Sequence, residues 1–319
     1  MTTAADTAPG TLDVLLGTYG HTGALKEGRI APPGVRLTFT EIRPVHRGFH
    51  RMADRQEFDV AEMALATYIL ARSFGRPVTA LPVVVTRGFH HARLVYNVTS
   101  GIREPKDLEG RRVGLRSYTQ TIPLWVRAFV AADYGVDLDK VTWVTFEPAH
   151  VRAYRPPANV VMAPEGSALS DMLLAGEIDA AIGVEGIEAE TIRPLLPDPA
   201  AAQGDWYRRT GIYPVNHLVT ITSALAAERP ELLRPLYDAF VAARDEYLAH
   251  LAGAGPFTAE DASWLAARDL VGGDPLPYGV GPNRRAIEAA AELAYRQHIT
   301  PRVLEMDELF EPDVLTFGA

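Results

Sequence analysis

The sequence has 319 residues, of which 47% are hydrophobic and 22% charged, so it is long enough to form two lobes with hydrophobic cores. Its net charge of −9 argues against nucleic acid as the main partner, because phosphate binding requires a basic face. A small anionic ligand remains compatible with that charge, since a few local arginines can bind it. Cysteine is absent, which excludes disulfides, thiolate nucleophiles and cysteine-ligated metals.

No stretch of about 18 apolar residues occurs, so we expect no membrane span and no membrane partner. The first ten residues lack the basic and apolar regions of a secretory signal, and this predicts a cytoplasmic protein.

In the first third of the chain, apolar or alternating runs that predict strands are separated by helical patterns. The predicted strands are 12–17, 35–40, 58–63 and 79–86, and the predicted helices are 46–55 and a segment that continues from the third strand through Ile69. A polar, glycine-rich loop, 18–23, follows the first strand.

The rest of the chain continues the alternation. Strands are predicted at 111–116, 142–146, 178–182 and around 218–221, and helices at 121–134, 167–175, 228–248 and 284–298. The segment 194–204 is rich in proline and alanine and is interpreted as a connection. Such alternation predicts an α/β fold with mostly parallel sheets, in which ligands bind at the carboxyl ends of the strands.

Four segments resemble the 4,5-dihydroxyphthalate decarboxylase family, and the resemblance runs from about Leu12 to Phe310. They are FDVAEMALATY at 58–68, RGFHH at 87–91, GIREPKDLEGRRVG at 101–114 and RTGIYPVNH at 209–217. The third segment, like GEIDA at 176–180, is similar to many binding proteins and supports only the fold, whereas RGFHH and GIYPVNH point to the decarboxylases.

The resemblance implies a two-lobed fold of the type-2 periplasmic-binding-protein class, with two mostly parallel sheets flanked by helices and a hinge between the lobes. Residues 1–95 and 212–319 would form the first lobe, residues 96–211 the second, and the ligand would bind in the cleft between them.

The same resemblance implies decarboxylation of a hydroxylated aromatic carboxylate without a cofactor. That reaction needs a cation to hold carboxylates, an acid to protonate the ring carbon, and a group that acts on a ring hydroxyl. In RGFHH we expect Arg87 to bind a carboxylate and His91 to donate the proton. The alternative is that the histidines lie on a solvated hinge and that Arg87 pairs with a surface acid.

Two further catalytic candidates are His217 and Glu62. His217 is either a second acid/base group or a buried, structurally satisfied histidine at the lobe crossing. Glu62 would orient a histidine, accept a hydroxyl proton or form a structural ion pair.

The remaining candidates would bind substrate. They are His90, Tyr19, His21, Thr67, Tyr118, Thr119, Thr121, Asn216 and Tyr213, and Tyr278 is a further candidate for the cleft. Thr119 or Thr121 can cap the helix that follows, where free amides attract anions. Trp125 is expected in the core and Arg127 in solvent.

This sequence departs from the family's usual residues at Thr18, Gly20, Ser117, His90 and Asn216. The family commonly has acidic residues in the loop that contains Thr18 and Gly20. It commonly has a glutamate before Tyr118, an arginine in place of His90 and a methionine in place of Asn216. These departures leave a different substrate open.

Glu41, His46 and His50 could offer metal ligands, but the chain has no His-Glu-x-x-His pattern, and a solvated helix face accounts better for the histidine spacing. We therefore predict no metal. The sequence also lacks a dinucleotide fingerprint and a phosphate-binding loop.

Two alternatives to the decarboxylase remain. A non-catalytic protein that binds a small anionic or aromatic ligand would have the same fold, and so would an enzyme that processes menaquinone precursors. The sequence leaves the oligomeric state open, with a homo-oligomer among the options.

Overall fold

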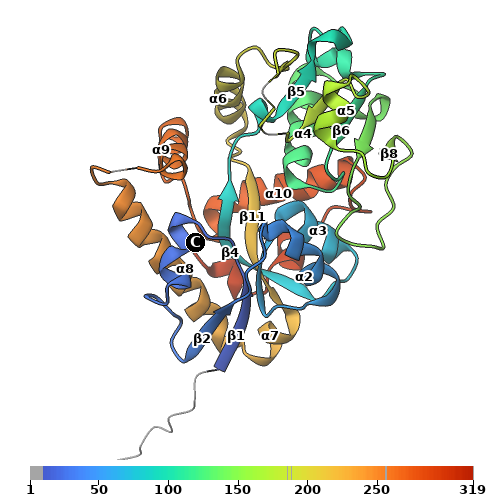
Figure 1. Cartoon of the computed structure of the whole chain (residues 1–319). Coiled ribbons are helices and arrows are strands. Elements are labelled where there is room, and N and C mark those ends of the chain that lie inside the picture. Colours follow the sequence, from blue (N-terminus) through green and yellow to red (C-terminus); the bar gives the residue numbers. More distant parts are fainter. Residues whose placement is uncertain (1–9, 185, 188, 256, 319) are drawn as a thin grey trace, which may run out of the picture.

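The computed structural model describes residues 10–184, 186–187, 189–255 and 257–318. Within them, two sheets flanked by helices form a lower and an upper lobe (Figure 1). Nearly all of the N-terminal segment on which the absence of a secretory signal was predicted, residues 1–9, lies outside the described residues.

The first sheet has the strand order β2-β1-β3-β11-β4. Its strands are β1 (Gly10–Leu15), β2 (Val35–Phe39), β3 (Val60–Ala64), β4 (Val78–Arg87) and β11 (Val215–Thr222). The helices of this lobe are α1 (Gly23–Lys26), α2 (Phe49–Arg55), α3 (Leu65–Ser73), α7 (Ser223–Glu228), α8 (Leu233–Leu251), α9 (Ala259–Val271), α10 (Val280–Arg296) and α11 (Met306–Leu309).

The second sheet has the order β10-β5-β9-β6-β7-β8. Its strands are β5 (Leu94–Asn97), β6 (Arg112–Leu115), β7 (Thr142–Thr145), β8 (Val160–Met162), β9 (Ala180–Ile182) and β10 (Ile192–Pro194). The helices of this lobe are α4 (Thr121–Tyr134), α5 (Leu169–Leu174) and α6 (Pro199–Thr210).

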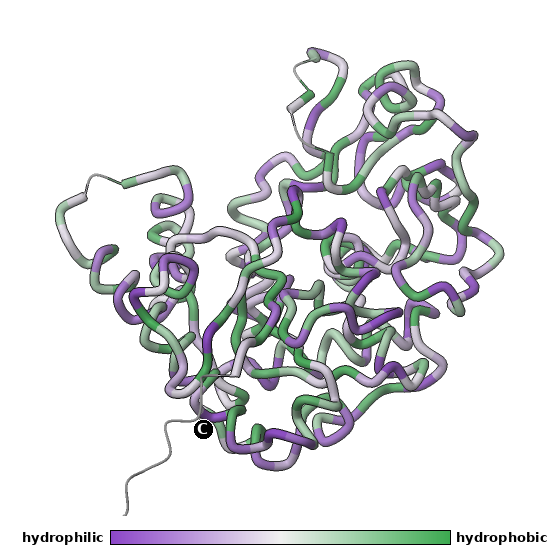
Figure 2. Tube along the Cα trace, turned by 60° about the horizontal axis from the view of Figure 1, so that its bottom comes forward, coloured by the Kyte–Doolittle hydropathy of each residue, from purple (hydrophilic) through white to green (hydrophobic). Residues whose placement is uncertain are grey.

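The central strands of the first sheet are buried on both faces. All five residues of β3 are buried, and nine of the ten in β4. Figure 2 shows hydrophobic residues concentrated along the inner segments and hydrophilic ones on outer turns. A strand covered on both faces is hydrophobic throughout rather than alternating, which explains the apolar run at 79–86. Glu62, in the middle of β3, is the exception, and it is charged and fully buried.

Two chain segments connect the lobes. Residues 88–93 lead from β4 to β5, and residues 211–214 lead from α6 to β11. These crossing segments agree with the expected hinge, although β5 already belongs to the second sheet at Leu94. The exact division at 95/96 and 211/212 stays a prediction.

Three details differ from the sequence prediction. Both sheets are mixed, because β11 runs antiparallel to β3 and β4, and β5 runs antiparallel to β9 and β10. The segment 194–204, predicted as a connection, includes the start of helix α6. Pro199 occupies its first turn, and the Asp198 carboxylate accepts a hydrogen bond from the Ala201 amide. Residues 198–201 are therefore the capped start of a helix and not part of a connection. Helix α9 was not predicted.

No helix among the described residues combines the length and the hydropathy that crossing a membrane requires.

Candidate functional site

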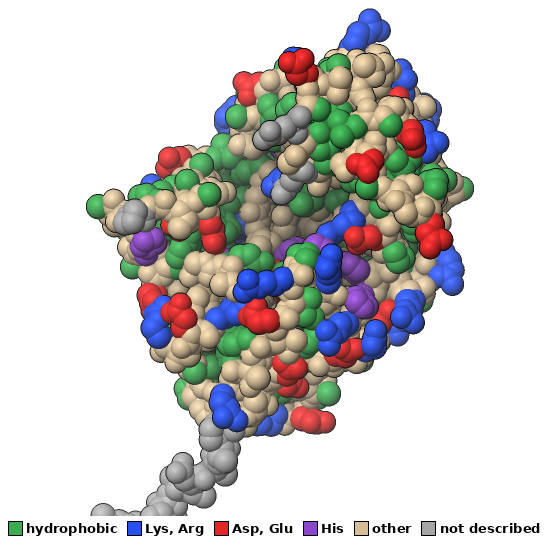
Figure 3. Space-filling model, viewed as in Figure 1, with side chains coloured by type: hydrophobic (Ala, Val, Ile, Leu, Met, Phe, Trp, Pro, Cys, Tyr) green, Lys and Arg blue, Asp and Glu red, His purple; other side chains and the backbone are tan. Residues whose placement is uncertain are grey.

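A cavity of about 400 Å³ lies between the lobes, and we call it the cleft cavity. Its first-lobe walls are His46, Phe49, Ala64, Asn216 and His217, and its second-lobe walls include Arg116, Gln120, Thr121 and His150. Figure 3 shows histidine side chains gathered at the hollow between the lobes, with basic side chains beside them. Two lining residues, Arg116 and Gly183, directly follow strands β6 and β9, which is the position expected for ligand-binding residues in α/β sheets.

The floor of the cleft cavity carries a carboxylate–histidine pair. His217 on β11 hydrogen-bonds through Nδ1 to Oε1 of the buried Glu62, at 2.6 Å. Because β11 lies beside β3, with His217 opposite Ala64, the two side chains meet across neighbouring strands. The carboxylate fixes the imidazole with Nδ1–H as the donor, so its Nε2 edge remains available in a cavity that His217 lines.

Glu62 is held as an anion although it is fully buried. Burial by itself raises a carboxyl pKa, but hydrogen bonds from His217, the Gly17 amide at 2.9 Å and the Tyr19 hydroxyl at 2.8 Å outweigh it, so the pKa of Glu62 is lowered. The same environment raises the pKa of Tyr19, first through burial and then through the Glu62 charge.

Glycine at position 17 makes this arrangement possible. A Cβ there would lie 2.5 Å from Cε2 of Tyr19, so only glycine lets the ring lie against the strand end and direct its hydroxyl at Glu62. The glycines of this loop were expected to let backbone approach a ligand. Instead, the Tyr19 ring lies against Gly17, and the Tyr247 ring lies against Gly20.

Arg116 and His46 form a second pair, across the cleft. Arg116 Nη1 lies 2.6 Å from His46 Nε2. Since arginine can only donate, His46 Nε2 must be unprotonated, and this agrees with a His46 pKa lowered to about 4 by burial and by the nearby positive charge of Arg116. The Gln120 side-chain oxygen, with the amide in its satisfied orientation, accepts from Nε and Nη2 of Arg116, and the Glu147 carboxylate is 3.6 Å from Nε.

His150 is the third histidine of the cleft cavity, and Thr67 positions it. The His150 Nδ1 atom and the Thr67 hydroxyl are 3.0 Å apart. Burial, followed by the charge of Arg116, lowers the pKa of His150 to about 4, so the ring is neutral near pH 7. A neutral imidazole is a proton acceptor.

The N-terminus of α4 also borders the cleft cavity, through residues 120–123. Neither threonine caps this helix, contrary to the prediction, because Gln120 is the N-cap residue and makes no capping side-chain hydrogen bond. The Thr121 hydroxyl instead accepts a hydrogen bond from the Ala66 amide at 3.0 Å, which links the starts of α4 and α3. The first amides of a helix lack partners within the helix, so this end of α4 favours an anion.

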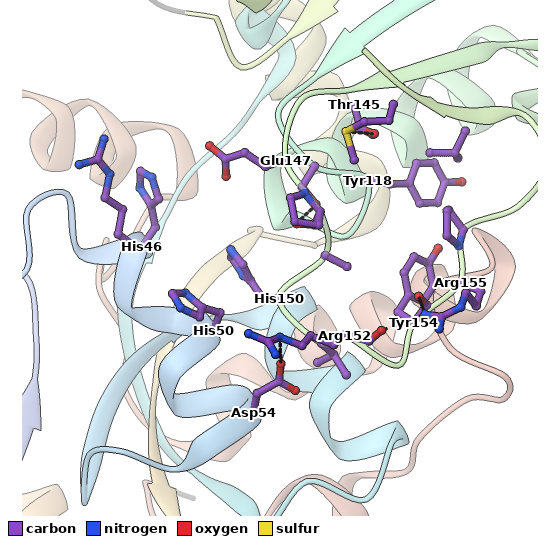
Figure 4. A pocket seen from close by; sticks show the side chains of 18 residues that line it. His46, His50, Asp54, Tyr118, Thr145, Glu147, His150, Arg152, Tyr154 and Arg155 are labelled. Carbon is purple, nitrogen blue, oxygen red and sulfur yellow. Dashed lines mark hydrogen bonds and ion pairs between the residues drawn. The ribbon is translucent and has the colours of Figure 1, made fainter. Parts of the chain in front are cut away.

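A larger cavity of about 760 Å³, the outer cavity, adjoins the cleft cavity at His46 and His150, which line both. Figure 4 shows His46 and His50 from the first lobe facing the loop after β7, with Arg152 beside Asp54 and with Tyr118 and Tyr154 at the far side. His46 and His50 are both half-buried and both line this space.

The predicted residues fall into three groups. His217, Asn216 and Thr121 line the cleft cavity and Tyr118 the outer cavity. Glu62, Tyr19, Thr67 and His90 lie behind these walls, each hydrogen-bonded to another residue of the site. The others, Arg87, Tyr213, Tyr278, His91, His21 and Thr119, are buried and line neither cavity.

Two departures from the family pattern contact each other. His90 Nε2 and Asn216 Oδ1 are 2.7 Å apart. Burial lowers the pKa of His90 to about 4, so the ring is a neutral donor that orients Asn216 at the edge of the cleft cavity.

Arg87 lies in a separate cavity of about 410 Å³, which we call the hinge cavity because Arg87 ends β4 and Gly211 and Tyr213 belong to the other crossing segment. Arg87 donates to Asn283 Oδ1 at 2.8 Å and to the Tyr213 carbonyl at 2.5 Å, and it stacks on the Tyr213 ring. The predicted alternative of a surface acid is wrong, since Arg87 is buried and its acceptors are neutral.

The His91 ring stacks on Phe129 of α4, with 4.1 Å between centroids. Only 2% of the residue is exposed, and neither ring nitrogen has a hydrogen-bond partner among the described residues. A solvated hinge position for His90 and His91 is therefore wrong, and burial lowers the pKa of His91 to about 4.

Three further expectations concern buried residues. His21 packs against Tyr19, Tyr247 and Trp264. Trp125 lies in the core as predicted, whereas Arg127, predicted in solvent, is fully buried and donates to Gln297 and to the Tyr118 carbonyl.

Within the described ranges, no group of three or more histidine or acidic side chains could hold a metal ion. Glu41, considered as a ligand with His46 and His50, pairs with Lys26 instead.

Sequence reasoning missed Arg116, His150, Phe49 and the role of His46. A signal was present for the first two, because Arg116 directly follows strand β6 and His150 lies in the loop after β7. Phe49 and His217 make a T-shaped ring contact, with 5.1 Å between the centroids. This contact depends on how α2 packs beside β11, and no sequence pattern indicates it.

The chain is similar to a described protein family and to proteins of known name. The NMT1/THI5 like family model matches residues 50–252. A 4,5-dihydroxyphthalate decarboxylase of Comamonas testosteroni is 28% identical, over 94% of this chain and 96% of the relative. A second one, from Pseudomonas putida, is 32% identical, over 62% of this chain and 81% of the relative.

Among solved structures, the periplasmic aliphatic sulphonate binding protein SsuA from Escherichia coli is similar in fold, with a TM-score of 0.56 at 14% identity. The alignment covers 96% of this chain and 99% of that one. This similarity confirms the predicted two-lobed binding-protein-like fold. The chain thus belongs to the NMT1/THI5 like family and, as its four segments predicted, to the family of the 4,5-dihydroxyphthalate decarboxylases.

Proposed function

We propose that the protein is a decarboxylase that acts, without a cofactor, on a hydroxylated aromatic carboxylate of the 4,5-dihydroxyphthalate type bound in the cleft cavity. The observation that carries the proposal is the Glu62–His217 pair at the floor of that cavity. Membership of the decarboxylase family supports the reaction, and the two relatives' names supply the substrate class.

His217 is the proton donor in this scheme. With Nδ1–H bonded to the Glu62 anion, a protonated His217 presents Nε2–H to the cavity, and the negative carboxylate stabilises the positive ring. Transfer of this proton to the ring carbon that bears the carboxylate forms a C–H bond. The bond from that carbon to the carboxylate then breaks, its electron pair returns to the ring, and carbon dioxide leaves.

Arg116 and the start of α4 hold the substrate carboxylates. Both border the cleft cavity opposite His217, and both favour an anion there. His150 is neutral and accepts the proton of the ring hydroxyl para to the reacting carbon, which pushes electron density toward that carbon. The hydroxyl regains this proton when the ring becomes aromatic again.

This assignment revises the roles predicted from RGFHH. Proton donation moves from His91 to His217, because His91 is stacked on Phe129 and lines neither cavity of the cleft. The role of binding the carboxylate moves from Arg87 to Arg116, because Arg87 lines the hinge cavity whereas Arg116 lines the cleft cavity.

The test is incubation of the purified protein with 4,5-dihydroxyphthalate, and with phthalates and benzoates that lack one hydroxyl or one carboxylate. We expect carbon dioxide release, and in D2O a dihydroxybenzoate that carries one deuterium at the position of the lost carboxylate. Binding of the same compounds without carbon dioxide release would contradict the proposal and favour the non-catalytic binding protein that the sequence left open. The cytoplasmic location and any oligomeric state stay predictions.

A further inference from the structure

We propose that the hinge cavity is a second ligand site, for a small aromatic hydroxycarboxylate with a single carboxylate. It shares no lining residue with the cleft or outer cavities. The inference therefore stands independently of the proposed reaction.

Arg87 brings a buried positive charge to the hinge cavity. Its guanidinium is bound by a side-chain amide oxygen and a backbone carbonyl, both of them neutral, and its Nε has no hydrogen-bond partner among the described residues. No carboxylate within those ranges lies at ion-pair distance from it. A buried cation without a counterion is unfavourable, and an anion in the adjoining cavity would offset that cost.

Two tyrosine hydroxyls at the hinge cavity are unsatisfied. Tyr213 and Tyr278 line the hinge cavity, are 6% and 4% exposed, and have hydroxyl groups with no partner among the described residues. Buried polar groups in proteins are nearly always hydrogen-bonded, so two orphans on one cavity indicate polar groups that an occupant would supply.

The charge and shape of the walls select the ligand class. Among the lining residues Arg87 is a buried cation and Arg285 an exposed one, and the negative charge of Asp274 lies 3.8 Å from Arg244. The buried wall therefore offers one cation for one carboxylate. Asp274 and the tyrosine hydroxyls can bind the ligand's hydroxyl groups, and Pro277 with the Tyr278 ring offers apolar contact. A hydroxylated benzoate combines these features.

The probe is 3,4-dihydroxybenzoate, titrated calorimetrically into the full chain. The variants Arg285→Ala and Tyr278→Phe remove, respectively, a charge and a hydroxyl from the cavity. We expect each to weaken one binding component, Arg285→Ala by at least about tenfold, because a charge-assisted hydrogen bond is lost. Benzene-1,2-diol, which lacks the carboxylate, should not bind to this component.

Two controls separate the hinge cavity from the cleft. Arg284→Ala changes the neighbouring residue of α10, which pairs with Glu288 and does not line the cavity, so binding should be unchanged. His217→Ala should spare the hinge component even if it abolishes turnover. The proposal is overturned if Arg285→Ala and Tyr278→Phe bind the probe like the unmodified protein, or if His217→Ala removes all binding.

Discussion

Replacing Glu62 with glutamine tests the proposed mechanism most directly. The change keeps the shape of the side chain but removes the negative charge from a residue that is fully buried. Glu62 accepts hydrogen bonds from His217 Nδ1, the Gly17 amide and the Tyr19 hydroxyl, at 2.6, 2.9 and 2.8 Å. A glutamine has one oxygen for these three donors, so its amide N–H₂ must face at least one of them.

The expected loss follows from what the carboxylate does for His217. Without the charge, the imidazolium loses its stabilising partner, and an amide N–H₂ facing Nδ1 would favour the tautomer with the proton on Nε2 and no positive charge. General acid–base catalysis contributes about 10²–10⁴-fold to a rate, and a misoriented histidine forfeits most of it. We therefore expect kcat to fall by about 10²–10⁴-fold, equivalent to roughly 3–5 kcal/mol of transition-state stabilisation.

The assay measures carbon dioxide release as a function of substrate concentration, so that kcat and KM are obtained separately. KM should change little, because the carboxylates of the substrate bind at the opposite wall. Asp59→Asn is the matched control: this carboxylate also accepts a hydrogen bond from a backbone amide, that of Asp13 at 2.8 Å, but it lines none of the three cavities. It should leave kcat unchanged.

Folding must be separated from chemistry, since Glu62 also fixes the loop after β1. Thermal unfolding of both variants, together with the double variant Glu62→Gln/His217→Ala, provides this separation. If the two residues act as a unit, the double variant is hardly slower than His217→Ala alone. A folded Glu62→Gln variant that retains kcat within about threefold would refute the pair as the proton donor.

Three other perturbations follow from the same geometry. Replacing His150 with glutamine removes the proposed acceptor of the hydroxyl proton, and we expect kcat to fall by about 10²-fold or more in steady-state assays with KM nearly unchanged. Arg116→Ala should raise KM at least about tenfold for dicarboxylates, while Arg112→Ala, which changes an exposed arginine at the start of the strand that Arg116 follows, should not. Equal KM values for both variants would argue against Arg116 as the clamp. Burial lowers the pKa values of His21 and His90 to about 4, so near neutral pH both are uncharged in the folded and mostly uncharged in the unfolded state. As the pH falls from about 6.5 toward 4, the unfolded chain takes up protons that the folded chain does not, and each residue should cost stability on the order of 3 kcal/mol by pH 4. Urea unfolding between pH 4.5 and 7 would measure this, and His21→Phe should reduce the slope.

The sequence predicted the architecture well because hydrophobic periodicity reports directly on burial. Thr121–Tyr134 is helical over the predicted range, and the apolar run at 79–86 lies within β4. Strand direction left no such trace, so the antiparallel course of β11 was not predicted. Helix α6 was missed because its start, Asp198 followed by Pro199, has the composition of a linker as well as of a helix cap.

The candidate site was harder to predict, for a physical reason. RGFHH places three polar side chains at a strand end, but the direction of each depends on the turn of the crossing segment and on the partner that lobe packing supplies. Phe129 covers His91, Asn283 binds Arg87, and only His90 reaches the cleft, through Asn216. None of these partners is within 35 residues of the motif in sequence, so no local pattern contains them.

The distribution of protonation states ties the fold to the chemistry. The interior that neutralises His150 by burial also contains Glu62, which stays ionised because three donors converge on it. Two groups of one site thus differ in charge, because burial removes water from His150 without supplying an anion, whereas hydrogen bonds replace the water around Glu62. A donor and an acceptor of protons can then face one ring at the same pH. The strand pairing that sets His217 beside Glu62 is therefore as much part of the proposed mechanism as the imidazole itself.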